Sequence, residues 1–141
     1  MRARLFALLL ALAASIPAPI QANAATLFEQ MGGAEGLTRI TNDAIDLALV
    51  NPIIKDSFSE TNIPRFRALL YAQFCELTGG PCKYEGRSMA RSHAPLKLTN
   101  LHFNALVEDL QTAMDRAKIP FSVQNRFLAI LAPMQRDVVT R

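Results

Sequence analysis

Apolar residues recur along this chain at intervals of three and four, the spacing of one face of an α-helix. Strict alternation of apolar and polar residues, which would indicate strands, is scarce, and so are runs of β-branched residues. Glycine and proline divide the apolar pattern into segments. The pattern therefore predicts an all-α fold.

The first half of the chain predicts three helical segments. A short lead-in starts at Leu27 and ends at Gly32-Gly33, and the next helix runs until Asn51-Pro52 stops it. A third helix starts at Thr61-Asn62-Ile63-Pro64, where a capping residue precedes a proline, and ends at Thr78-Gly79-Gly80-Pro81. The positions expected to face the core on the second and third helices are Leu37, Ile40, Thr41, Ala44, Ile45, Ala48, Phe66, Leu69, Leu70, Gln73, Phe74 and Leu77.

The second half predicts one short helix and two long ones. In the turn-rich stretch after the third helix, only Ser88 to Ala94 can form about two helical turns before Pro95. One amphipathic helix begins at Thr99 and another near Ser122, and Pro133 should bend the last because it removes a backbone hydrogen bond. Their expected core positions are Phe103, Leu106, Val107, Leu110, Met114, Phe127, Ile130 and Leu131.

The N-terminal residues 1–24 have the features of a signal peptide. Arg2 and Arg4 precede an apolar run from Leu5 to Ala14, and Ala22-Asn23-Ala24 is a small-x-small cleavage signal. The apolar run has about half of the ~20 residues that span a bilayer. We therefore expect cleavage after Ala24, a single domain over residues 25–141, a periplasmic or secreted location, and no membrane association after cleavage.

Charge and cysteine content bear on the class of partner and on the redox state of the chain. The chain has 15 Lys and Arg against 12 Asp and Glu, and loss of Arg2 and Arg4 with the signal peptide leaves 13 against 12. Such a small net charge argues against a nucleic-acid partner. Cys75 and Cys82 would meet an oxidising compartment, where an intramolecular disulfide, free thiols and an intermolecular link are all open.

Candidate metal chemistry rests on two histidines, His93 and His102. His93 follows Met89 by four residues on the short predicted helix, and haem iron commonly takes one neutral imidazole from such a helix. The alternative is that His93 binds no metal and is an ordinary surface or core histidine. A zinc site that combines the histidines with the cysteines would need spacings that fit no usual zinc arrangement. A helical interaction module without cofactor leaves the histidine-bearing segment unexplained.

Motifs over nearly the whole chain fall at the spacing of one family. They are GG-x-E-G-L from Gly32, Phe58 with Thr61-Asn62, GGP-x-x-Y-x-G-R-x-M-x-x-x-H from Gly79 to His93, Leu98-Thr99 with Phe103, and L-A-P-M-x-R-D-V-V from Leu131. With these motifs the chain resembles the group 1 truncated haemoglobins.

That resemblance implies a two-over-two helical sandwich that holds one haem b per chain, with His93 as the proximal iron ligand. It further implies that Arg67 reaches a haem propionate. The apolar residues at haem-lining positions are Phe58, Phe66, Leu70, Phe74, Met89, Leu98, Phe103 and Ile130. Each of these apolar residues would serve equally as core in a protein without haem.

The distal side departs from the family pattern. Where relatives carry a Phe-Tyr pair on the second helix, this chain has Ala44-Ile45, and the distal helix offers Phe66 and Leu70. Losing one hydrogen bond to bound oxygen costs on the order of 1–3 kcal/mol, or roughly tenfold to a hundredfold in affinity. We expect an apolar pocket that holds oxygen weakly, unless Gln73 or Tyr71 supplies a donor.

The resemblance favours a reversible binder of dioxygen or another diatomic gas over an enzyme. Handling of nitric oxide or peroxide, and electron transfer, would use the same iron. The chain contains no flavin or nicotinamide motif, so any reductant must be an external reductase. We expect a monomer.

Overall fold

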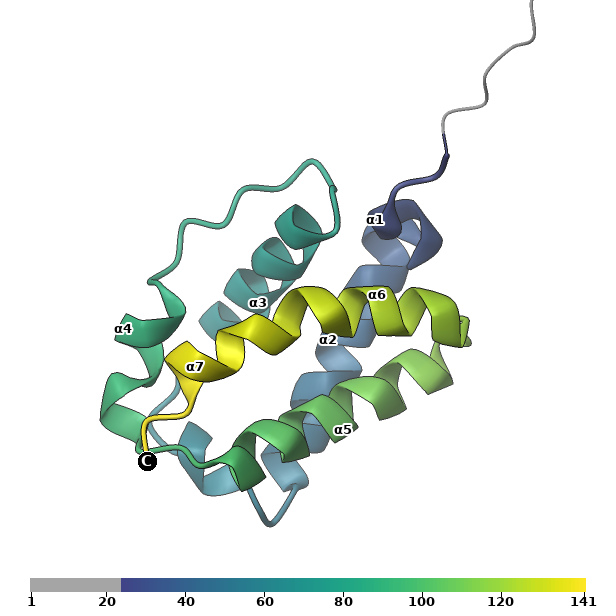
Figure 1. Ribbon diagram of the computed structural model, residues 1–141. Coiled ribbons are helices and arrows are strands. Elements are labelled where there is room, and N and C mark those ends of the chain that lie inside the picture. The colour runs from purple at the N-terminus through teal and green to yellow at the C-terminus, as the bar shows by residue number, and fades with distance from the viewer. Residues whose placement is uncertain (1–23) are drawn as a thin grey trace, which may run out of the picture.

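The computed structural model describes residues 24–141, and all regular structure in that range is helical. Four helices form two packed pairs: α2 (Gly33–Val50) with α3 (Ile63–Leu77), and α5 (Asn100–Arg116) with α6 (Phe121–Leu131). Figure 1 shows α5 and α6 lying across α2 and α3. The predicted all-α, two-over-two arrangement is confirmed. Except for Ala24, the predicted signal peptide lies outside the described residues.

Short helical turns connect the long helices. They are α1 (Leu27–Gln30), η1 (Lys55–Phe58), α4 (Met89–His93), η2 (Ala94–Leu96), η3 (Ala132–Met134) and α7 (Gln135–Val138), where η marks a 3₁₀-helix. The bend expected at Pro133 is present as a 3₁₀ turn, since α6 ends before this proline and α7 continues after it. No described helix is long and apolar enough to cross a membrane.

The helix ends follow local rules of capping. The Asn62 side chain accepts a hydrogen bond from Arg65 N at 3.0 Å and so satisfies one free amide of α3. After α3, Gly79 adopts φ +82°, a left-handed conformation that favours glycine. These two residues determine where α3 begins and ends, which in turn sets the start of the loop that leads to α4.

The core consists of two separate clusters of buried residues. All six core positions predicted on α2 are buried. The larger cluster joins α2, α3, α5 and α6 around Phe127 and Met114, while the smaller one comprises Ala48, Ile54 and Ala105 with Phe58 and Leu106 against it. On α3, α5 and α6 several predicted core residues are only half-buried: Phe66, Leu69, Leu70, Leu77, Phe103, Leu106, Val107, Ile130 and Leu131.

A disulfide joins Cys75 on α3 to Cys82 in the following loop, with the two Cα atoms 5.6 Å apart. Of the three possibilities left open by the sequence, the structure shows the intramolecular bridge. The chain turns tightly between the cysteines, because Gly80 N donates to Cys75 O at 2.8 Å. A side chain at Gly80 would collide with the sulfur of Cys75.

Candidate functional site

His93 lies at the end of α4 with one ring nitrogen already engaged. Its Nδ1 is 2.8 Å from the carbonyl oxygen of Met89, one turn earlier. A carbonyl only accepts hydrogen bonds, so Nδ1 carries the ring proton and the lone pair resides on Nε2. A neutral imidazole oriented through its other nitrogen is the usual form of a metal-binding histidine.

The segment that carries His93 contacts α3 and α7, and a hydrogen bond within the preceding loop orders its start. The Gln73 amide on α3 donates to the Met89 sulfur at 3.4 Å, and the Tyr84 hydroxyl donates to Arg87 O at 2.7 Å just before α4. Burial raises the pKa of Tyr84 and keeps this phenol protonated. On the other side α4 packs against α7. His93 is thereby positioned on a helix too short to be stable alone.

Most of the apolar residues expected around a haem are only half-buried in this structure. Phe74 and Leu98 are buried, whereas Phe58, Phe66, Leu70, Met89, Phe103 and Ile130 are half-buried. The rings of Phe58 and Phe66 lie 5.5 Å apart and connect η1 with α3. Half-buried aromatic and aliphatic side chains of this kind would become buried against a flat apolar ligand. The residues present thus fit a haem.

The distal positions on α2 carry no hydrogen-bond donor for a ligand. Ala44 and Ile45 are 2% and 1% exposed and wholly apolar. One turn earlier, Thr41 Oγ1 is the single buried side-chain polar atom without a partner in the described part of the chain. It lines a cavity of about 340 Å³ between α2 and α3. The structure therefore agrees with an apolar distal side at Ala44-Ile45.

The two alternative donors differ in their surroundings. The Gln73 amide donates to the Met89 sulfur on α4. Tyr71 lines the cavity between α2 and α3 together with Thr41. Gln73 is therefore engaged by α4, and the role of Tyr71 as a donor stays a prediction.

Arg67 contacts α2 in this structure. Its guanidinium donates to the backbone and side-chain oxygens of Asn42 at 3.1 and 3.2 Å and forms an ion pair with Asp46. To reach a haem propionate, Arg67 would have to leave these partners. That role stays a prediction.

His102 contributes to the start of α5. Its Nδ1 accepts a hydrogen bond from Thr99 N at 3.1 Å, which caps the helix. Its side chain is half-buried. The zinc hypothesis fails because the disulfide consumes both cysteine thiolates, and the described residues contain no cluster of metal-binding side chains.

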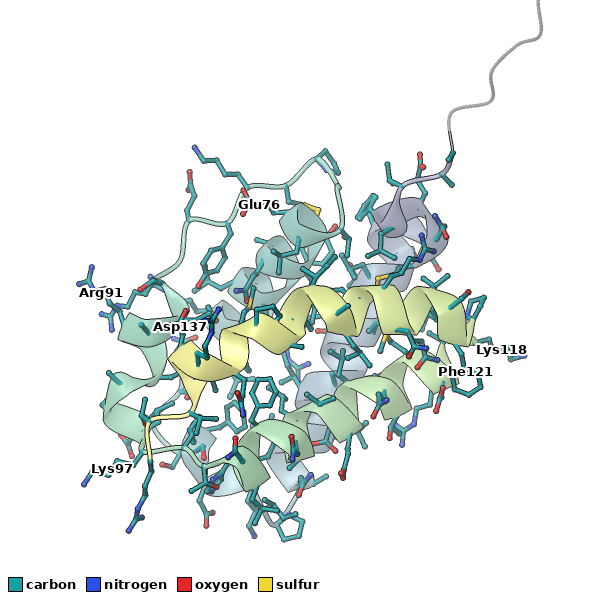
Figure 2. All side chains as sticks on the ribbon, viewed as in Figure 1. Glu76, Arg91, Lys97, Lys118, Phe121 and Asp137 are labelled. Atoms are coloured by element: carbon teal, nitrogen blue, oxygen red, sulfur yellow. A yellow bond between two sulfur atoms is a disulfide. The ribbon has the colours of Figure 1, made fainter. Side chains whose placement is uncertain are left out.

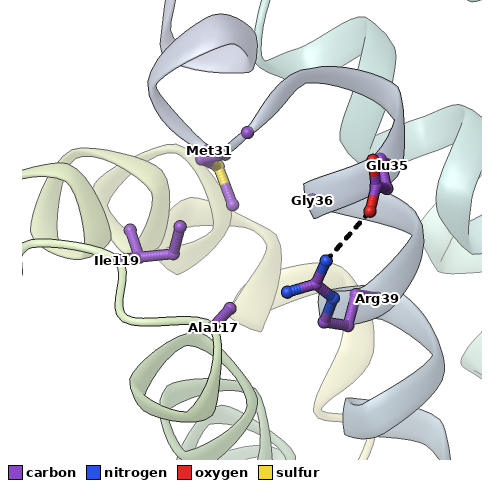
Figure 3. Close-up of a pocket in the computed structure, with 7 residues that line it drawn as sticks. Met31, Glu35, Gly36, Arg39, Ala117 and Ile119 are labelled. Atoms are coloured by element: carbon purple, nitrogen blue, oxygen red, sulfur yellow. Dashed lines mark hydrogen bonds and ion pairs between the residues drawn. The ribbon is translucent and has the colours of Figure 1, made fainter.

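A second cavity, of about 210 Å³, lies far from His93. It is formed where the α1–α2 and α5–α6 turns meet, lined by Met31, Gly32, Glu35, Gly36, Arg39, Ala117 and Ile119. Figure 3 shows Glu35 and Arg39 paired at its edge, 3.2 Å apart. Both side chains are largely exposed, so this pair is worth little. The cavity has no buried polar group that would select a ligand.

Comparison with known proteins identifies the family. Residues 26–140 match the family described as Bacterial-like globin. The chain is 29% identical over 122 residues to the group 1 truncated hemoglobin GlbN of a Synechocystis species, which covers 82% of this chain and 98% of that protein. It is 25% identical over 120 residues to GlbN of Mycolicibacterium paratuberculosis, with 85% and 88% covered. The chain belongs to the bacterial-like globin family.

Solved structures show the same fold. The truncated hemoglobin of Tetrahymena pyriformis in its Fe(III) form superimposes with a TM-score of 0.80 at 23% identity, covering 83% of this chain and all of the other. A 2/2 hemoglobin from a Synechococcus species, in the cyanomet state with covalently attached heme, gives a TM-score of 0.77, again at 23% identity with 83% and 100% covered. The truncated-globin fold predicted from the sequence is thus confirmed.

Proposed function

We propose that this globin binds one haem b per chain through His93 Nε2 and reversibly binds a diatomic gas, dioxygen foremost, on the opposite side of the iron. The observation that carries the proposal is the Nδ1 bond of His93 to the Met89 carbonyl, which leaves Nε2 as the nitrogen available to a metal. Bound haem supplies a gas-binding iron. The names of the similar proteins, all hemoglobins, support the same function.

The side chains at the distal positions of α2 affect gas binding because they lack hydrogen-bond donors. Ala44 and Ile45 are buried on α2 and Gln73 is directed to α4, so these three positions offer no side-chain donor to a partly anionic bound oxygen. The apolar lining still excludes water, which protects a bound gas from displacement. Oxygen should therefore bind reversibly and leave quickly.

A matched pair of variants tests the iron ligand. His93→Ala should abolish the Soret absorbance of the haem-loaded protein or leave weakly bound haem, because the proximal ligand is gone. His102→Gln is the control, since glutamine can still accept the Thr99 amide bond that caps α5. A normal five-coordinate spectrum in His93→Ala would refute the assignment.

We further propose that residues 1–24 are removed and that the mature protein is a monomer in the periplasm or outside the cell. The arginine-flanked apolar run and the Cys75–Cys82 disulfide support this location, because disulfides persist in oxidising compartments. Any reductant for the iron would be an external protein. Mass spectrometry of the protein recovered from a periplasmic extract should give a chain that starts at Ala25; a full-length cytoplasmic chain would contradict the proposal.

A further inference from the structure

The charges of the described chain are distributed unevenly. Residues 83–97 and 135–141 contain six basic residues against two acidic ones, whereas the rest of the chain from Ala24 onward has seven basic against ten acidic. We call these two segments together the basic edge. Its basic residues, all exposed, are Lys83, Arg87, Arg91, Lys97, Arg136 and Arg141. A nearly neutral molecule thus carries a net charge of +4 on one part.

The two segments of the basic edge adjoin in the fold. Helix α4 packs against α7, and the backbone amides of Thr140 and Arg141 donate to Leu98 O at 3.0 and 3.1 Å. Figure 2 shows Arg91, Lys97 and Asp137 on the same side of the molecule, opposite to Lys118. The two ion pairs found among the described residues lie elsewhere, on α2 and α3. The six cations are therefore available to an external partner.

An apolar spot lies within these cations. Ala94 and Pro95 are exposed, and Leu96 beside Lys97 is 42% exposed. An apolar centre with a charged rim is the common construction of a transient protein–protein interface. A membrane-binding helix instead needs a long apolar face, and α4 has five residues. The composition of the basic edge therefore favours a protein partner of opposite charge.

The proximal histidine lies within the basic edge. His93 is half-buried and directly precedes the exposed Ala94-Pro95-Leu96 turn. If the proposed function holds, on which this inference rests, the imidazole of His93 connects this exposed turn to the iron. We propose that the basic edge docks an acidic one-electron-transfer protein that keeps the haem reduced. One electron passes from the reduced centre of the partner, which is oxidised, to ferric iron, which becomes ferrous.

The test uses reduced flavodoxin, an acidic flavoprotein, as the probe of this surface. Arg91→Glu/Lys97→Glu reverses two charges of the basic edge. Arg116→Glu/Lys118→Glu is the matched control, because it makes the same charge change at the α5–α6 corner. Each variant replaces one helical arginine and one lysine with positive φ, which is 50° for Lys97 and 57° for Lys118. The rate of haem reduction is followed by stopped flow under carbon monoxide, and binding of oxidised flavodoxin by calorimetric titration.

At low ionic strength, flavodoxin should reduce the haem of Arg91→Glu/Lys97→Glu at least about tenfold more slowly than the haem of wild type. Flavodoxin should also bind this variant correspondingly more weakly, because steering charges act on association. The control should stay within about twofold of wild type, and all three proteins should converge at high salt, where charges are screened. Equal losses in both variants would overturn the proposal, since only net charge would matter. Failure of wild type to bind flavodoxin would overturn it too.

Two further results separate this proposal from its rivals. Vesicles that contain phosphatidylglycerol are titrated in parallel; if they bind through Arg91 and Lys97 while flavodoxin reduction is unaffected, the surface is a membrane site and the proposal is wrong. If wild type takes up no haem, the proposed function fails, and the flavodoxin titration still decides whether the docking surface exists.

Discussion

Removal of the disulfide tests how the proximal segment is held. In Cys75→Ala/Cys82→Ala the cross-link between α3 and the loop before α4 is lost, at a sequence separation of 7. Closing so short a loop is worth about 2.5 kcal/mol at 25 °C in the chain-entropy account. Cys75 is fully buried, so the space left by its sulfur adds roughly 1 kcal/mol. The expected loss is about 3–4 kcal/mol of unfolding free energy.

A domain of this size has a total stability of about 5–15 kcal/mol, so the variant should fold but unfold at clearly lower urea concentration. Urea unfolding followed by far-UV circular dichroism measures the difference. Wild type with its disulfide reduced is the control, because it keeps both sulfur atoms and loses only the cross-link. A loss below about 1 kcal/mol in the double variant would refute the entropic reasoning.

The same variant should release haem several times faster, because the loop that leads into α4 loses its covalent anchor. Transfer of haem to an excess of apomyoglobin gives the rate. If haem loss is unchanged while stability falls, the contacts of Tyr84 and Gln73 are sufficient to hold α4.

Three other predictions concern single side chains. Ile45→Tyr should supply the missing distal donor and slow oxygen dissociation by roughly tenfold to a hundredfold in stopped-flow measurements; an unchanged rate would show that position 45 does not reach the ligand. Gly80→Ala would place a Cβ 2.6 Å from the Cys75 sulfur and 2.7 Å from the Phe28 ring, so urea unfolding should show a loss of about 1–3 kcal/mol, and wild-type stability would contradict the close packing. The raised pKa of Tyr84 contributes stability that is complete below about pH 10 and is lost as the pH rises through the raised pKa. The urea midpoint of wild type should therefore fall more steeply above pH 10 than that of Tyr84→Phe, and parallel curves would argue against burial of the phenol.

The sequence by itself determined the helices and the candidate iron ligand. The buried face of α2 matches its apolar spacing at all six positions, and Asn62 and Pro133 mark helix boundaries through capping and loss of an amide. These features depend on residues within one or two turns of each other, which is why periodicity and local chemistry suffice to predict them. For His93, local spacing gave only one of two candidate histidines, and the resemblance of the motif from Gly79 to His93 to a known family selected it as the predicted iron ligand.

Only the tertiary structure decided which partners the polar side chains take. Gln73 donates to Met89 on α4 and Arg67 pairs with Asp46 on α2, because both orientations depend on how helices distant in sequence are placed. The basic edge arises likewise, since its two segments adjoin only when α7 packs on α4. Such contacts follow from the relative position of whole helices, which no local pattern contains.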